Sequence, residues 1–122
     1  MSERLLRCAV IYALVGICIG LFMSITHDFL IRGVHTHANL VGWVSMAVMA
    51  LVYKTYPAMA ESKLATVQFW AHNIGLPIML VGIYGVVNIL AFGIPCAAIG
   101  SLIVAVAFIS FAINVWCNAC KK

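Results

Sequence analysis

Two histidines, His35 and His37, stand at the start of a strongly apolar segment that runs past Trp43. Groups that can ionise or bind a metal are costly inside a bilayer, so by default they mark a functional site. Residues i and i+2 of a helix lie about 200° apart around its axis, which points the two rings to different sides. One ion held by one helix is usually gripped by residues i and i+4. The spacing therefore predicts one helix that serves two sites.

Neutral imidazoles suit haem iron, copper or zinc, so His35 and His37 are candidate metal ligands. Asn39 and Trp43 lie next along the same segment and are candidate cofactor-binding residues. The alternative is that the two histidines only form hydrogen bonds between helices or face water at the membrane surface.

The helices that must position these residues follow from composition. The chain has 122 residues, of which 66% are hydrophobic and 8% charged, and its mean hydropathy is +1.14. Soluble domains carry about 25% charged residues, so we expect an integral membrane protein with one all-α domain. Its length allows about four spans of roughly 20 residues. The expected spans are 8–25, 34–53, 65–90 and 96–116. Gly16 and Gly20 give the first span a face for close helix packing.

The basic residues give an orientation. The net charge is +4, but its carriers are few and dispersed, which does not indicate nucleic-acid binding. Arg32 lies between the first two spans, and the other basic residues lie on the side of both termini. These others are Arg4, Arg7, Lys54, Lys63, Lys121 and Lys122. The positive-inside rule then places both termini in the cytoplasm of a bacterial-type inner membrane.

Further polar residues are candidates for binding. Arg32, one turn before the histidine pair, could neutralise a haem propionate, or it could contact water or lipid head groups. His72 and Asn73 in the third span could bind a quinone, relay protons or contact a cofactor. A hydrogen bond between helices is an equally good interpretation of His72.

Cys117 and Cys120 form a C-x-x-C pair near the end of the chain. Lys121 follows where attachment of a c-type haem needs histidine, and two thiolates are half of a zinc site. We interpret the pair as part of an unpaired cytoplasmic tail, with a site shared between subunits as the alternative.

Two consecutive stretches resemble the tenth and eleventh helices of the catalytic subunit of the C-type haem-copper oxidases. The residues that carry the resemblance are His35, His37, Gly42-Trp43-Val44, Tyr53 and Pro57, followed by Phe69-Trp70 and Ile74-Gly75. The whole chain then resembles one four-helix repeat, helices nine to twelve, of a twelve-helix subunit with threefold pseudo-symmetry.

The resemblance implies that His35 and His37 bind two different haems. A homotrimer would restore the threefold arrangement, with His35 of one protomer and His37 of the next holding one haem b at each interface. The implied function is that of a b-type cytochrome that transfers electrons near the outer membrane face. The implied electron donor is a quinol or another respiratory protein.

Other functions stay open at this point. A haem with one open axial position could bind, reduce or sense nitric oxide or oxygen, and a non-catalytic interaction or assembly subunit is a third possibility. A copper or zinc site without haem comes last. Full oxygen reduction is not expected, because the chain has no further helix with three copper-binding histidines and no His–Tyr crosslink pattern. Whether the protein is an enzyme is left open.

Overall fold

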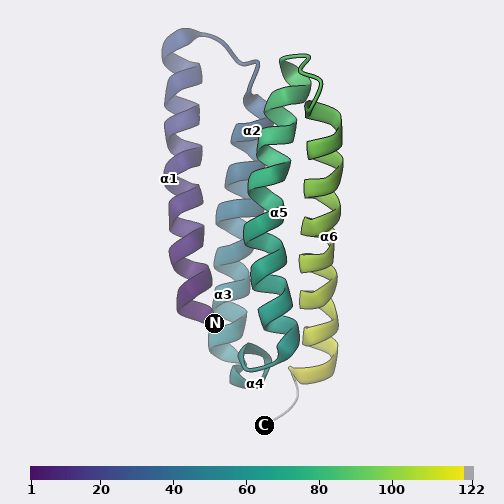
Figure 1. The fold of residues 1–122 in the computed structure, drawn as a ribbon. Helices are drawn as coiled ribbons and strands as arrows, with labels where there is room; N and C mark the ends of the chain where they lie inside the picture. The colour runs from purple at the N-terminus through teal and green to yellow at the C-terminus, as the bar shows by residue number, and fades with distance from the viewer. Residues whose placement is uncertain (120–122) are drawn as a thin grey trace.

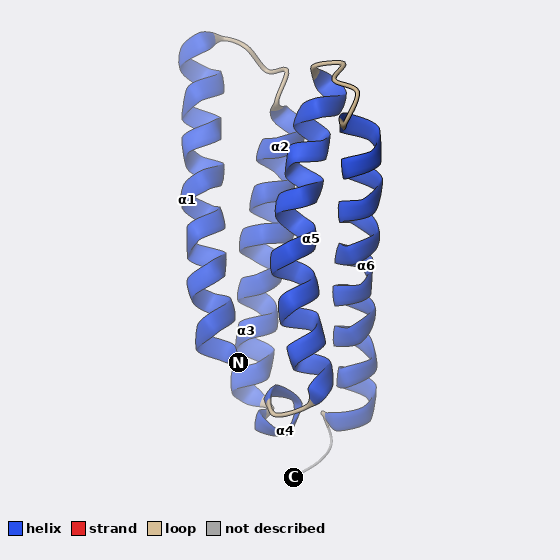
Figure 2. Cartoon of the chain, in the orientation of Figure 1, coloured by secondary structure: helices blue, strands red, loops and turns tan. Residues whose placement is uncertain are grey.

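The computed structural model describes residues 1–119 and shows four helices long and apolar enough to cross a membrane (Figures 1 and 2). The helical segments are α1 (Ser2–Thr26), α2 (Arg32–His37), the π-helix η1 (Ala38–Val44), α3 (Ser45–Thr55), the single turn α4 (Pro57–Ala60), α5 (Lys63–Val87) and α6 (Gly93–Asn118). The second membrane span is the continuous run α2–η1–α3. The all-α expectation with four spans is confirmed. Cys120, Lys121 and Lys122 lie outside the described residues.

Proline and capping residues set the boundaries of the spans. Tyr56, directly before Pro57, leaves the helical region with φ −122° and ψ 82°, as residues before proline tend to do. This confirms the expected break after the second span. Ser62 then caps α5, because its hydroxyl accepts a hydrogen bond from the Ala65 N–H at 3.1 Å. The third span stops at Val87, a few residues earlier than expected, where the chain turns towards α6.

The four spans pack as two neighbouring groups. Among the described residues, α1 packs on α2, η1 and α3, whereas α5 and α6 lie against each other along their length (Figure 1). Glycines make the second contact possible. A Cβ atom on Gly82 would overlap the backbone of Ala97, and one on Gly100 would overlap the backbone of Met79. Helices in lipid gain stability from such close backbone approach.

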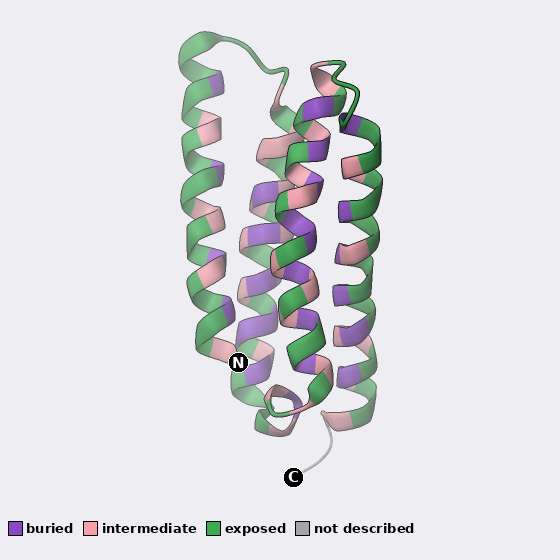
Figure 3. Cartoon of the chain, viewed as in Figure 1, coloured by how far each residue is buried: buried purple, intermediate pink, exposed green. Residues whose placement is uncertain are grey.

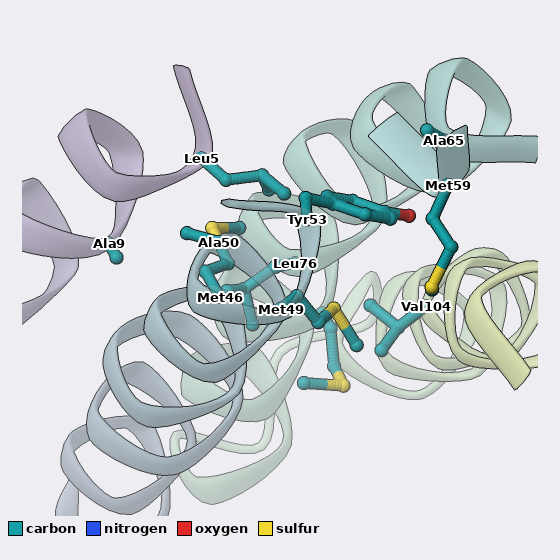
Figure 4. Close-up of a cluster of buried hydrophobic side chains, with 11 residues drawn as sticks. Leu5, Ala9, Met46, Met49, Ala50, Tyr53, Met59, Ala65, Leu76 and Val104 are labelled. Carbon is teal, nitrogen blue, oxygen red and sulfur yellow. The ribbon is translucent and has the colours of Figure 1, made fainter. Parts of the chain in front are cut away.

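A cluster of buried hydrophobic side chains, drawn in Figure 4, includes residues from the end of the bundle where α1 begins, and buried positions continue along the helices (Figure 3). Tyr53 and Met59 are enclosed there together with Leu5 of α1. The Ser2 hydroxyl donates to the carbonyl of Ala50 at 2.8 Å and so ties the start of α1 to α3. By contrast, α2 at the other end has no buried residue. The helix that carries the histidine pair is therefore the loosely packed part of the second span.

Candidate functional site

His35 projects from α2 towards α1. Its Nδ1 atom lies 2.8 Å from the carbonyl oxygen of Gly16. Because a carbonyl only accepts, Nδ1 carries the proton and donates it. The ring also lies over Gly20, where a Cβ atom would come within 2.9 Å of its Cε1 atom. The Gly-x-x-x-Gly face of α1 therefore makes room for His35.

His37 lies on the other side of α2. Its Nδ1 atom donates to the carbonyl oxygen of Gly33 at 2.8 Å, one helical turn earlier. Residues four apart share a helix face, and Gly33 faces α5, since a Cβ atom there would lie 3.2 Å from Cγ2 of Ile83. The structure thus turns His35 towards α1 and His37 towards α5, as their spacing predicts.

The Nε2 atoms of both histidines remain available. Within residues 1–119, neither Nε2 makes a hydrogen bond, and neither is among the enclosed unpaired atoms. Both side chains are only partly buried. A histidine that binds a metal typically donates one ring N–H to a backbone carbonyl or carboxylate, which fixes its tautomer and aims the other nitrogen. His35 and His37 each have this arrangement, with Nε2 as the free lone pair.

Asn39 and Trp43 follow the histidines on η1. The Asn39 amide donates to the backbone carbonyl of His35 at 2.8 Å and packs on Gly16, where a Cβ atom would overlap it. Trp43 is partly buried against the core of the bundle. In this structure Asn39 supports the backbone of the ligand helix and the contact with α1.

Arg32 opens α2 at the edge of a surface cleft of about 560 Å³. The cleft is lined by Asp28, Phe29, Leu30, Arg32, Gly33 and Val87. The Asp28 carboxylate accepts a hydrogen bond from the Leu30 N–H at 2.9 Å and so shapes the loop before α2. Arg32 is exposed, which leaves its guanidinium accessible to an anionic group beside the histidine pair.

His72 has a different environment, because its side chain is fully buried. Its Nε2–H donates to the carbonyl of Val41 at 2.9 Å, and its Nδ1 accepts from the Gln68 amide at 3.3 Å. Both ring nitrogens are therefore used within the protein. The hydrogen bond between helices, one of the two interpretations of His72 from sequence, is the contact that this residue makes. Its neighbour Asn73 donates to the carbonyl of Phe69 at 2.8 Å.

Sequence reasoning missed other buried polar residues. Gln68 and Asn114 have no exposed surface, and the Asn114 amide donates to the carbonyl of Met59 at 3.0 Å. The available signal was a polar residue inside an apolar span, which in Gln68 also lies one turn before His72. Cys117 is exposed, while its C-x-x-C partner Cys120 lies outside the described residues.

No group of three or more His, Cys, Asp or Glu side chains in the described part of the chain could hold a metal ion. A haem differs in what it requires, because the macrocycle supplies four nitrogens and the protein adds only axial ligands. The two separate, aimed Nε2 atoms fit that requirement.

No protein-family model matches this chain, no curated protein is significantly similar to it, and no solved structure matches its fold.

Proposed function

We propose that this protein is a membrane b-type cytochrome that holds haem between subunits through His35 and His37 and transfers electrons near the outer membrane face. One observation carries the proposal. Each imidazole donates its Nδ1–H to a backbone carbonyl at 2.8 Å, which leaves an unbonded Nε2 on either side of α2. The resemblance of the surrounding residues to the haem-binding helix of C-type haem-copper oxidases gives the same pair the same role.

The residues near the pair suit a haem. His35 and His37 would provide axial nitrogens, and the exposed Arg32 at the start of α2 would pair with a propionate. When bound, haem supplies a one-electron iron couple whose potential depends on axial ligands, burial and nearby charge. The chain itself would bind the group through its axial imidazoles, whose tautomers are fixed by the Nδ1–H bonds to Gly16 and Gly33.

The opposite directions of the two rings support an assembly of several chains. His35 lies on the α1 side of α2 and His37 on another side, so the two rings of one chain do not converge on one iron, and a second protomer would supply the other axial ligand. An interface between two different faces of identical chains closes into a ring when the rotation that relates neighbouring protomers divides a full turn evenly. A homotrimer would form such a ring of twelve helices, the number in the oxidase subunit that the sequence resembles.

The distribution of charge supports an orientation. Arg4, Arg7, Lys54 and Lys63 lie at the end of the bundle where the termini emerge, and Arg32 lies at the opposite end (Figure 1). With the basic end in the cytoplasm of a bacterial-type inner membrane, the histidine pair lies near the outer face. A quinol or another respiratory protein could deliver the electron there.

The absorption spectrum of the purified protein, with pyridine haemochrome quantification per chain, tests the proposal. We expect one low-spin b-type haem per chain. His35→Ala and His37→Ala should each abolish the low-spin spectrum. His27→Asn is the matched control, because His27 is an exposed residue outside the pair with φ 54°, which asparagine tolerates, so the spectrum should not change.

Two results would count against the proposal. If the purified protein shows no Soret band, it binds no haem, and an interaction or assembly role is favoured. If the spectrum is five-coordinate and shifts with carbon monoxide, the haem has one open axial position for a gas and is not held by two histidines.

A further inference from the structure

We infer that His72 is a positioning residue, which holds the π-helix η1 in place and thereby aims His35 and His37. The haem part of this inference rests on the proposed function. The orientation of the two imidazoles can be tested without haem.

The hydrogen bonds of η1 leave one carbonyl without its usual partner. The Ser45 N–H donates to the carbonyl of Leu40, five residues back, and the Ser45 hydroxyl donates to the same oxygen at 2.8 Å. In an α-helix the Ser45 N–H would instead donate to Val41, four residues back. The carbonyl of Val41 has therefore lost its α-helical donor.

His72 replaces that donor from another helix. Its Nε2–H reaches the Val41 oxygen at 2.9 Å across 31 residues of sequence. Gln68 selects the tautomer, because its amide donates to Nδ1 at 3.3 Å and so leaves the proton on Nε2. The Phe108 ring lies beside the imidazole, with 5.5 Å between centroids. The buried pair Gln68–His72 thus presents one aimed N–H to a carbonyl of η1 that has lost its α-helical donor.

The π-helix η1 determines which residues of α2, the segment before it, face the neighbouring helices. A turn of π-helix holds about one residue more than a turn of α-helix, so conversion to α would rotate α2 by about 100° relative to α3. Thr36 would then take the place of His35 opposite α1, and Ala38 the place of His37. An unpaired carbonyl inside a bilayer is costly, so loss of the His72 donor favours this conversion.

The first test compares two substitutions. His72→Leu removes the donor, while His72→Gln keeps an N–H at a similar distance from the backbone. Both are made with Thr36→Cys after replacement of the native cysteines, and the rate of maleimide labelling at position 36 is measured. Thr36 is exposed in the structure. We expect His72→Leu to slow labelling roughly tenfold, because position 36 turns towards α1, and His72→Gln to restore it.

The second test removes the extra residue of the π-helix. Leu40 is 55% exposed, so its deletion costs little packing. A chain without Leu40 can form a continuous α-helix with the histidine pair still on its original faces, and it no longer needs the His72 donor. Deletion of Leu40 together with His72→Leu should therefore recover both the labelling rate and the low-spin haem spectrum. A residue that only fills space would not be rescued in this way.

The outcomes separate this inference from the proposed function. If wild-type protein contains no haem but labelling follows the expected pattern, His72 is the positioning residue and the haem proposal fails. Equal labelling in His72→Leu and His72→Gln would overturn the inference. If His72→Leu does not fold, recovery of folded protein by the Leu40 deletion supports the inference, and failure of that double variant to fold overturns it.

Discussion

The ring of His35 is bonded to the backbone of another helix, through its Nδ1–H and the carbonyl oxygen of Gly16 at 2.8 Å. An intrahelical bond would hold the ring relative to α2 alone, as the bond to Gly33 does for His37. His35 is instead aimed by the position of α1. The geometry of the candidate site therefore depends on how the first two spans pack.

The proposed division of haem ligands between protomers predicts complementation between two inactive chains. His35→Ala and His37→Ala should each bind no low-spin haem when expressed alone. Mixed in one membrane, any ring that contains both chains has one interface with both histidines. In each mixed trimer one interface of three is then complete, so mixed trimers should hold roughly a third of the wild-type haem. Quantification of haem per chain after co-purification through two different affinity tags measures this.

The control for complementation is a chain that carries both substitutions. When the double variant is co-expressed with either single variant, one of the two histidines is absent from every chain, so no interface is complete and no low-spin haem should be recovered. Absence of any recovery in the mixture of single variants would contradict a haem shared between two protomers.

Gly20 should tolerate no side chain without disturbing the site. In Gly20→Ala the new Cβ lies 2.9 Å from Cε1 of His35, so the ring must shift from its bond with Gly16. Overpacking of this kind costs about 1–3 kcal/mol, and we expect roughly tenfold weaker haem retention on dilution. Gly33→Ala is the comparison, because its Cβ would lie 3.2 Å from Ile83 and needs a smaller adjustment. Equal haem retention in the two variants would refute the dependence on α1.

The contact between α5 and α6 should be sensitive to one added side chain. Gly82→Val would force the helices apart at the Ala97 backbone, and we expect a loss of about 3 kcal/mol or more of stability. Ala105→Val adds comparable bulk to an exposed position of α6 and should have almost no effect. Thermal unfolding in detergent, followed by circular dichroism, distinguishes the two variants.

Ile89 occupies a position that glycine would fill better. After α5, the Leu90 N–H donates to Gly85 at 2.8 Å and the Ile89 N–H donates to Val86 at 3.1 Å, the pattern of a Schellman motif. Ile89 has φ 57° and is 93% exposed, so a β-branched residue adopts a left-handed conformation with little packing in return. Ile89→Gly should raise stability by about 1 kcal/mol. Leu90→Gly, at a position without positive φ, should not, and an equal rise in both variants would argue against relief of strain.

Hydropathy and helix-breaking residues predict most of the fold. The four apolar runs and Pro57 locate the spans to within a few residues, because lipid leaves a crossing backbone few options besides a helix. The opposite directions of His35 and His37 also follow from spacing alone, since both residues lie within the regular α2. The close contact of α5 and α6 was foreseeable as well, from glycines seven residues apart at Gly75 and Gly82, and at Gly93 and Gly100.

The π-helix could not be predicted in this way. Nothing local distinguishes Ala38–Val44 from an ordinary apolar helix, and its freed carbonyl is satisfied by His72, 31 residues after Val41. The same contact explains why His72 is buried away from the histidine pair. The position of His72 in the sequence did not decide between this role and cofactor binding. The bond from His35 to Gly16 depends on tertiary packing in the same manner.

The separate packing of α1 gives the chain a natural point of division. This helix contacts the second span and is joined to it by the short segment 27–31, of which residues 27–30 are exposed, while α5 and α6 form their own tight hairpin. We expect that a protein of this design can be assembled from two fragments, one of them α1 alone. An α1 peptide supplied separately would again provide the Gly16 carbonyl that accepts from His35. Neighbouring chains could likewise exchange their α1 helices, and the number of histidine sites would stay the same.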